Sequence, residues 1–264
     1  MSFSILKSSI FLLAAMGLTT AAPAENVQGN SKGFKTRQIG LTQNGAPLLQ
    51  SFYFKFNSED HHFGGMEVQP NAPTQNQMKY GYSDTNGDDE YFYNITLAPY
   101  FGEIFRRTHE PEFCHGASCT FPIEHPANLA GQVFVLRGFY IQFRGGDHHI
   151  DQIRISESNG MATVALNDQN DDDNFAVNLH YAYIPQSKLS VISSASGTAA
   201  GGARVSIPAG VGVVRGFNMD FVSSDRHIRD IGVIMNGSGR LEVYYGDKTP
   251  TDQFRWKVDY GILR

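Results

Sequence analysis

The side chains best suited to chemistry belong to an Asp-x-His triplet that occurs three times, as Asp60 and His62, Asp147 and His149, and Asp225 and His227. Imidazole and carboxylate groups are common ligands of zinc and other transition metals, so each triplet could bind a metal ion. The apolar alternation changes phase at the same place, which is typical of a turn or β-bulge where Asp accepts backbone N–H groups. The middle residue is His61, then His148, then Arg226, and this difference favours the structural interpretation.

Two acidic loops are candidate calcium sites. Oxygen-bearing side chains recur at alternate positions, as Asp84, Asn86, Asp88 and Asp89 in the first loop and Asp168, Asn170, Asp172 and Asp173 in the second. Calcium takes about six to eight oxygen ligands, and the spacing is similar to the start of an EF-hand loop that lacks its later glutamate and its helices. The same composition is typical of a solvated turn. A third loop, from Asp247 to Asp252, keeps only the outer acids, which argues against one metal ion type shared by all three.

Several aromatic residues fall on the opposite phase from the inward-facing positions of their strands. They are Tyr53, Tyr140, Phe92 and Tyr244. Exposed aromatic rings can stack on sugars, because tyrosine combines apolar area with a polar edge. In a layered β protein such residues are also packing contacts or domain interfaces. Trp256 shares the inward phase of Phe254 and Val258 and is therefore predicted to lie in the core.

No catalytic motif of recognisable spacing is present. The sequence has no Gly-x-Ser-x-Gly elbow, no His-Glu-x-x-His pair and no phosphate-binding glycine loop. Two carboxylates that meet only in space would leave no motif, so a hydrolase stays an alternative. A threefold repeat is more natural for a binding protein than for an enzyme, which usually needs one pocket.

The elements that position these residues come from three tandem repeats of about 80 residues each. Phe52, Phe139 and Phe217 begin equivalent runs, in which a second Phe and the triplet aspartate follow at the same spacing. Apolar and polar residues then alternate with period two, which predicts β-strands, and Gly, Asn, Asp and Pro separate the runs as turns require. This pattern therefore predicts a core of four strands in each repeat.

The repeats also define the expected domains. We expect a signal peptide over residues 1–24, repeat 1 over 25–100, repeat 2 over 101–185 and repeat 3 over 186–264. Three further segments could add one lead-in strand to each repeat, at residues 37–41, 119–123 and 203–207. Residues 101–128 are expected to form an insertion loop, and the small residues at 193–202 to form a flexible linker.

The predicted fold class is all-β, with three tandem antiparallel β-sandwich-like repeats, arranged in a row or around a pseudo-threefold axis. A pseudo-threefold β-trefoil is an alternative, because its repeats also hold four strands, although about 80 residues is long for a trefoil unit. An incomplete propeller that closes by oligomerising is a further alternative.

The first residues have the pattern of a secretory signal peptide. Lys7 precedes an apolar run at residues 10–18, and residues 22–24 form a small-residue cleavage site. The run is too short to span a bilayer. We therefore expect a secreted or extracellular protein with no transmembrane segment, periplasmic if the host is a Gram-negative bacterium.

The two cysteines, Cys114 and Cys119, are predicted to form a disulfide, because export brings both thiols into an oxidising compartment. The alternative is a metal site that would use nearby histidines at positions 109, 115 or 125. The composition, with 41% hydrophobic residues and a formal net charge of −5, indicates a globular protein without an electrostatic reason to bind nucleic acid.

The run from Gly246 to Gly261 resembles the end of an H-type lectin domain, in which a Gly-Asp-Thr-like turn precedes a final alternating strand. The resemblance covers one strand and one turn per unit, and the Asp-His-His turn is not part of that family's pattern. It implies small antiparallel β-sandwiches that assemble as trimers and bind sugars, so three units in one chain could mimic the trimer. No binding residue is carried over.

Together these patterns predict a secreted, non-catalytic binding protein, lectin-like and with repeated sites. Its partner would be a glycan or a cell-surface or matrix polymer, three equivalent sites would give avidity, and the chain could also form oligomers. One alternative is an extracellular structural or matrix protein whose loops are stiffened by Ca²⁺. Another is a secreted hydrolase with one pocket between repeats.

Overall fold

The fold is built almost entirely from β-strands. The structure is a computed structural model that describes residues 24–40, 45–57, 62–70, 77–84, 90–144, 149–168, 174–222, 227–247 and 251–264. Over these ranges the only helical element is one 3-10 turn, η1 (Gln186–Lys188). No described helix is long and apolar enough to cross a membrane. The all-β prediction is confirmed.

Among the described residues, six strands fall in each repeat. Repeat 1 contains β1 (Glu25–Lys32), β2 (Lys35–Gln38), β3 (Ala46–Phe56), β4 (Phe63–Pro70), β5 (Gln77–Asp84) and β6 (Glu90–Tyr100). Repeat 2 contains β7 (Phe105–Cys114), β8 (Ser118–Pro122), β9 (Gln132–Phe143), β10 (Ile150–Ser158), β11 (Met161–Asp168) and β12 (Phe175–Pro185). Repeat 3 contains β13 (Leu189–Ala200), β14 (Gly202–Ser206), β15 (Gly212–Phe221), β16 (Ile228–Asn236), β17 (Arg240–Asp247) and β18 (Gln253–Leu263).

Each repeat is a sandwich of two three-stranded antiparallel layers. In repeat 1 the layers are β1-β6-β3 and β4-β5-β2, and the corresponding strands of the other two repeats are ordered in the same way. Period-two alternation produces this arrangement, because one side of every layer is apolar and must face the other layer. On β6, for example, Tyr91, Tyr93 and Ile95 are buried while the residues between them are partly exposed.

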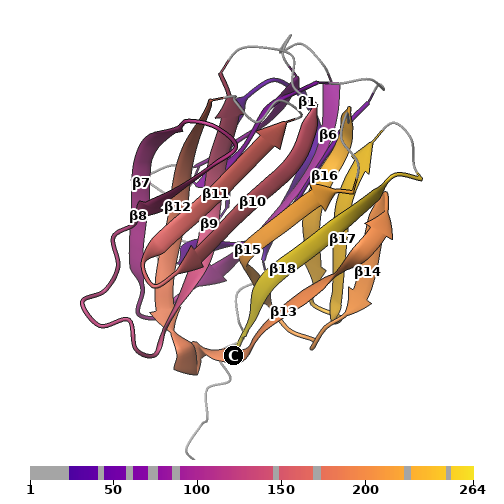
Figure 1. Ribbon diagram of the computed structural model, residues 1–264. Helices are drawn as coiled ribbons and strands as arrows, with labels where there is room; N and C mark the ends of the chain where they lie inside the picture. The colour runs from indigo at the N-terminus through magenta and orange to yellow at the C-terminus, as the bar shows by residue number, and fades with distance from the viewer. Residues whose placement is uncertain are drawn as a thin grey trace, which may run out of the picture.

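The sandwiches join edge to edge into three six-stranded sheets. Sheet 1 has the order β1-β6-β3-β16-β17-β14, sheet 2 the order β2-β5-β4-β9-β12-β7, and sheet 3 the order β13-β18-β15-β10-β11-β8. Sheet 3 crosses the front of Figure 1. The joining pairs are β3 with β16, β9 with β4, and β15 with β10, each in the same register. Every sheet therefore contains strands from two repeats, and the repeats surround a pseudo-threefold axis.

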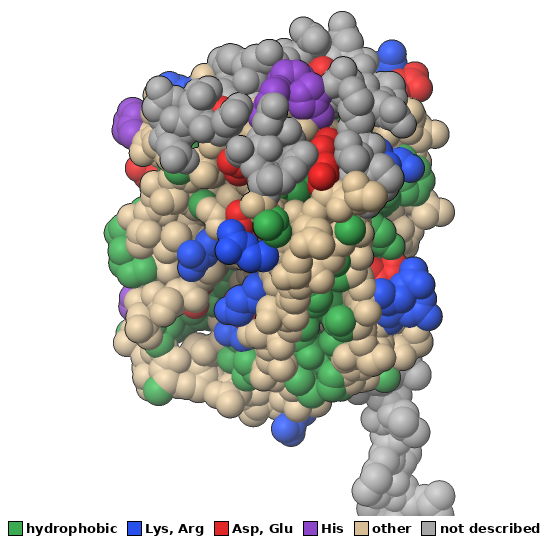
Figure 2. Space-filling model, turned by 45° about the vertical axis from the view of Figure 1, so that its right-hand side comes forward, with side chains coloured by type: hydrophobic (Ala, Val, Ile, Leu, Met, Phe, Trp, Pro, Cys, Tyr) green, Lys and Arg blue, Asp and Glu red, His purple; other side chains and the backbone are tan. Residues whose placement is uncertain are grey.

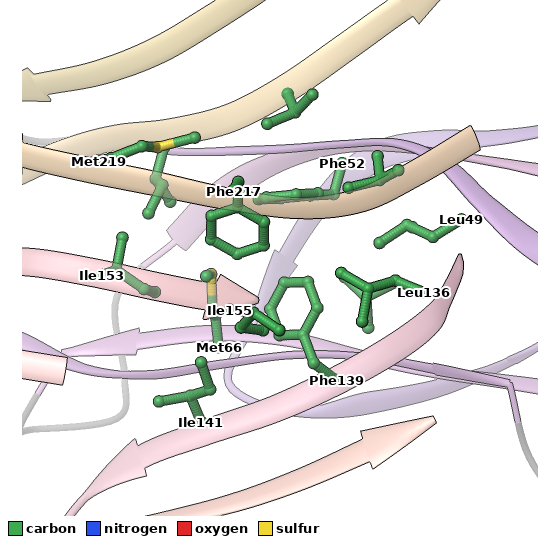
Figure 3. Packing of buried hydrophobic residues seen from close by; sticks show 14 of the residues in the cluster. Leu49, Phe52, Met66, Leu136, Phe139, Ile141, Ile153, Ile155, Phe217 and Met219 are labelled. Carbon is green, nitrogen blue, oxygen red and sulfur yellow. The ribbon is translucent and has the colours of Figure 1, made fainter. Parts of the chain in front are cut away.

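Three equivalent phenylalanines meet on this axis. The ring centroids of Phe52, Phe139 and Phe217 lie 5.1–5.6 Å apart, and none of the three is more than 2% exposed. Figure 3 shows the three rings close together among aliphatic side chains from several strands. Their strands, β3, β9 and β15, are the strands that join neighbouring repeats. One core thus spans all three repeats.

A β-bulge in each of these strands adds a polar contact to the next repeat. The pairing register skips Gln50, Arg137 and Arg215, which are equivalent residues. Their side chains donate hydrogen bonds around the axis in a cycle, from Gln50 to the carbonyl of Met235 (2.9 Å), from Arg137 to that of Pro47 (3.2 Å) and from Arg215 to that of Phe134 (3.3 Å). Each bond joins two different repeats.

The lead-in segments form more structure than the sequence predicted. Each repeat begins with two edge strands, one on either layer, and the second of each pair lies close to the predicted lead-in strand. Residues 193–202 were expected to be a linker, but most of them belong to β13, which pairs with β18 along its whole length. Their small polar and apolar residues alternate too weakly to signal a strand. Residues 101–128 contain β7 and β8.

The disulfide between Cys114 and Cys119 is present, with Cα atoms 5.5 Å apart. It connects the end of β7, at the edge of sheet 2, to β8, at the edge of sheet 3. The bond therefore closes one corner between two sheets of repeat 2.

Truncation of one axial ring should destabilise the whole molecule. We expect Phe139→Ala to lower the free energy of unfolding by about 3–5 kcal/mol, because the cavity opens where all three repeats meet. Phe101→Ala is the control, since Phe101 is 52% exposed and its loss should cost less than about 0.5 kcal/mol. Denaturant unfolding measures both free energies. Equal losses of stability in the two variants would contradict a core shared by all three repeats.

Candidate functional site

Three histidines, one from each repeat, meet at one end of the pseudo-threefold axis. The ring centroids of His62, His149 and His227 are 4.4–4.5 Å apart, and the ring planes are inclined at 54–55° to one another. One ring nitrogen from each residue lies within 4.8 Å of the other two. All three side chains are partly exposed. Figure 2 shows histidine side chains gathered at one end of the molecule. We call these three residues the histidine triad.

The joining strands bring the triad together. Each histidine directly precedes β4, β10 or β16, the strands that pair with the next repeat. Each of these strands has a register shift at its second residue, between Phe63 and Gly65, Ile150 and Gln152, or Ile228 and Asp230. The predicted bulge is therefore present beside the triplet. The bulge and the convergence of the histidines occur together.

Three buried carboxylates lie near the same ends of these strands. Asp84, Asp168 and Asp247 end β5, β11 and β17, and they pair in register with the residues that directly follow the three histidines. They are only 8%, 3% and 6% exposed. The remaining predicted ligands lie outside the described residues, namely Asp60, Asp147, Asp225, Asn86, Asp88, Asp89, Asn170, Asp172 and Asp173.

A second candidate site is an aromatic cluster on the outer face of sheet 1. The ring of Tyr53 lies 4.9 Å from that of Tyr244 and 6.2 Å from that of Phe92, measured between centroids. All three rings are partly exposed. They come from β3, β17 and β6, and Gly232 of β16 pairs with Tyr53 on one side and Tyr244 on the other. We call Tyr53, Phe92 and Tyr244 the aromatic platform.

The hydroxyl groups of both platform tyrosines are hydrogen-bonded to carboxylates. The Tyr53 hydroxyl donates to Asp230 (3.3 Å), and the Tyr244 hydroxyl donates to Glu242. Burial raises the pKa of the Asp230 carboxyl above its usual range, against the opposing charges of Arg229 and Lys55. Burial and the nearby Asp230 raise the pKa of Tyr53. The phenols are therefore fixed as neutral hydrogen-bond donors.

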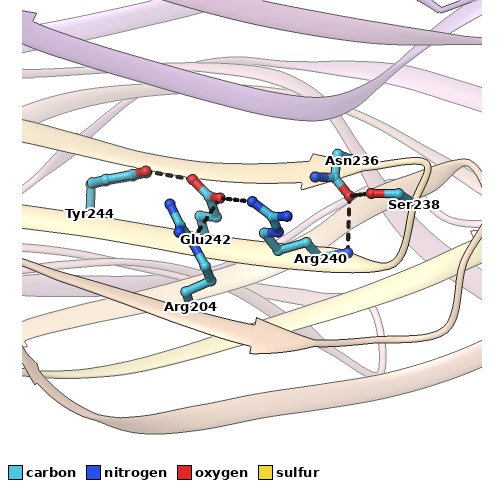
Figure 4. A network of polar contacts seen from close by, with 6 residues as sticks. All are labelled: Arg204, Asn236, Ser238, Arg240, Glu242 and Tyr244. Atoms are coloured by element: carbon cyan, nitrogen blue, oxygen red, sulfur yellow. Dashed lines mark hydrogen bonds and ion pairs between the residues drawn. The ribbon is translucent and has the colours of Figure 1, made fainter.

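Glu242 is the centre of a polar network beside the platform (Figure 4). Its carboxylate forms ion pairs with Arg204 (3.0 Å) and Arg240 (3.3 Å). Burial acts to raise its pKa, but the hydrogen bonds from Tyr244 and Arg240 and the charge of Arg204 outweigh burial, so the pKa of Glu242 lies below its usual value. The turn beyond is closed by Asn236, whose side-chain oxygen accepts from Ser238 and from the backbone of Arg240.

The other two outer faces differ at the equivalent positions. Tyr140 of sheet 2 does not join the platform. Its ring lies 6.1 Å from that of Phe34, which packs over Gly81 of β5, and β4 lies between β5 and the strand of Tyr140. The residue of sheet 3 at the place of Tyr53 is Asn218, which accepts a hydrogen bond from Gln152 (2.8 Å). The predicted stacking residues thus separate into one group of three and one tyrosine that packs beside Phe34.

Comparisons with known proteins identify no family. No family model matches the chain, and no curated protein is similar to it. Among solved structures, A223, a turret protein in Sulfolobus turreted icosahedral virus, aligns with 62% of this chain and 100% of its own, with 12% identity and a TM-score of 0.20.

The buried carboxyl of Glu67 in sheet 2 should make stability depend on pH. Burial raises the pKa of Glu67 from 4.5 to about 7, although Lys79 acts in the opposite direction. Because the folded-state pKa is raised, the folded protein holds this proton more tightly than the unfolded chain does. The corresponding stability is present below about pH 4.5 and is lost as the pH rises through about 7.

Glu67→Gln should therefore stabilise the protein at alkaline pH and have little effect at acidic pH. At about pH 8 the gain should be at most about 3 kcal/mol, from 1.36 kcal/mol for each pKa unit. Urea unfolding of both proteins across this range measures the difference. If the free energies of unfolding of the two proteins changed with pH in parallel, the raised pKa of the Glu67 carboxyl would be contradicted.

Proposed function

We propose that the protein is a secreted carbohydrate-binding protein and that sugar binds on the outer face of sheet 1. The observation that carries this proposal is the aromatic platform, since Tyr53, Phe92 and Tyr244 come from three different strands and form one partly exposed group. Aromatic rings bind the apolar C–H face of a sugar, while phenols and neighbouring polar groups bind its hydroxyls.

The geometry of the rings suits a single sugar chain better than a flat crystalline surface. The ring planes of Tyr53 are inclined at 59° to those of Tyr244 and Phe92, so the three rings do not lie in one plane. A pyranose could stack on one ring while the next ring contacts its edge. The phenol positions are already set by Asp230 and Glu242, which reduces the entropy cost of ordering them on binding.

Polar side chains on both sides of the platform could form hydrogen bonds with sugar hydroxyls. Asn94 of β6 pairs with Tyr53 and accepts a hydrogen bond from Asn26 (2.8 Å), which also donates to Thr96 (3.0 Å). On the opposite side stand the Glu242 carboxylate and its two arginines. Amide, carboxylate and guanidinium groups offer the donors and acceptors that a hydroxyl-rich ligand needs.

The proposal places one site on the molecule and not three. Its three outer faces carry Tyr53, Tyr140 and Asn218 at equivalent positions, and of these Tyr53 belongs to the group of three aromatic rings. Secretion is part of the proposal and is supported by the signal-peptide pattern of residues 1–24 and by the disulfide.

Removal of the platform should weaken sugar binding without unfolding the protein. We expect the native protein to bind a subset of an oligosaccharide array, and Tyr53→Ala with Tyr244→Ala to weaken binding of the best array ligand by roughly tenfold or more for the pair. Titration calorimetry measures the affinities. Circular dichroism checks that the variants are folded.

Tyr140→Ala is the matched control, because this partly exposed tyrosine stands at the place of Tyr53 but in repeat 2, outside the group of three rings. It should bind the same ligand with native affinity. Uniformly flat binding of the native protein across the array would refute a carbohydrate ligand. Equal losses in Tyr140→Ala and the platform variants would refute the position of the site.

A further inference from the structure

We propose that the histidine triad binds one divalent transition-metal ion, shared by all three repeats. The three side chains supply one nitrogen each from equivalent positions on the pseudo-threefold axis. This differs from the interpretation of the Asp-x-His triplets as separate metal sites, because a single ion takes one ligand from every repeat.

The separation of the nitrogens is close to that of a coordinated ion. Zinc binds histidine nitrogens at about 2.0–2.1 Å, so three nitrogens around a tetrahedral ion lie about 3.3 Å from one another. In the triad one nitrogen of each ring is already within 4.8 Å of the others. Binding would bring these nitrogens closer by up to about 1.5 Å, through rotation of the three side chains toward the axis.

The chemistry of the ligands selects the class of ion. Three imidazoles suit zinc, nickel, cobalt or copper, whereas calcium and magnesium prefer oxygen ligands. Three protein ligands also leave at least one coordination position for water or for an atom of another ligand. The buried carboxyl groups of Asp84, Asp168 and Asp247 lie at the same end of the axis, paired with the residues that directly follow the triad.

A shared ion also accounts for the sequence pattern of the triplets. The middle residue changes from His61 and His148 to Arg226, so it cannot be a common ligand. The last residue is histidine in all three repeats, and these are the side chains that meet. The substitution that counts against three separate sites therefore leaves a single threefold site intact.

Such an ion would cross-link the three repeats at one end of their common core. The ligands are far apart in the sequence, at positions 62, 149 and 227, and each stands at the start of a strand that pairs with a neighbouring repeat. Because the unfolded chain does not hold these histidines together, binding of the ion would favour the folded state.

Zinc titration of the full secreted chain tests the proposal. The protein is purified without a polyhistidine tag, stripped with chelator and titrated with zinc chloride in a calorimeter. We expect one zinc ion per chain and a melting temperature that rises with zinc. With cobalt as the probe, visible absorption bands should report histidine coordination.

Single variants His62→Gln, His149→Gln and His227→Gln should each bind zinc at least roughly tenfold more weakly, since even outer-shell changes at metal sites cost about 10–100-fold. The triple variant should show no zinc-dependent rise in melting temperature and no cobalt bands. His125→Gln is the control, because His125 is exposed and lies outside the triad, and it should behave like the native protein. Circular dichroism of the metal-free variants checks their folding.

Absence of zinc binding by the native chain would overturn the proposal, and so would a stoichiometry of three ions per chain. Unchanged binding in the folded triple variant would overturn it as well. The zinc titration and the carbohydrate array can fail separately, because neither the platform tyrosines nor their hydrogen-bond partners belong to the triad.

Discussion

The contact between Phe52, Phe139 and Phe217 is the constraint on which the rest of the structure depends. Three central strands can bring one ring each to a common axis only if neighbouring repeats approach closely enough to pair their backbones. The glycines at these joins show how tight the approach is. A Cβ atom on Gly138 would lie 2.0 Å from the carbonyl oxygen of Val68, and one on Gly216 would lie 2.7 Å from that of Ile155. Repeat 1 has Ser51 at the equivalent position, and its hydroxyl accepts a hydrogen bond from the backbone of Met235 (2.9 Å).

The threefold equivalence of the interior does not extend to the surface. An inward residue touches residues from other repeats, so a change in one repeat disturbs all three. An outward residue away from the axis meets neighbours on its own face, and the positions of Tyr53, Tyr140 and Asn218 differ accordingly. This difference separates two kinds of site. A site on the axis uses the same residue from every repeat, whereas a site on an outer face can occur once.

The sequence was sufficient to predict the all-β class, the core strands and the disulfide, because period-two alternation and cysteine spacing are local signals. It could not predict which strands join, since alternation identifies the buried face of a strand but not its partner. The meeting of Tyr53 with Tyr244 depends on the pairing of β3 with β16, and the meeting of the histidines depends on all three joins. The strand at residues 189–200 was missed because its inward side chains are small.

The two candidate sites share strand β16, so an ion bound by the histidine triad would also affect the aromatic platform. Strand β16 begins directly after His227 and carries Gly232, which pairs with both Tyr53 and Tyr244. The aromatic platform therefore exists only while repeats 1 and 3 are joined through β3 and β16. An ion held by His62 and His227 would connect the same two repeats at the end of the same pair of strands. Its binding energy would stabilise that join, and with it the relative positions of the two tyrosines.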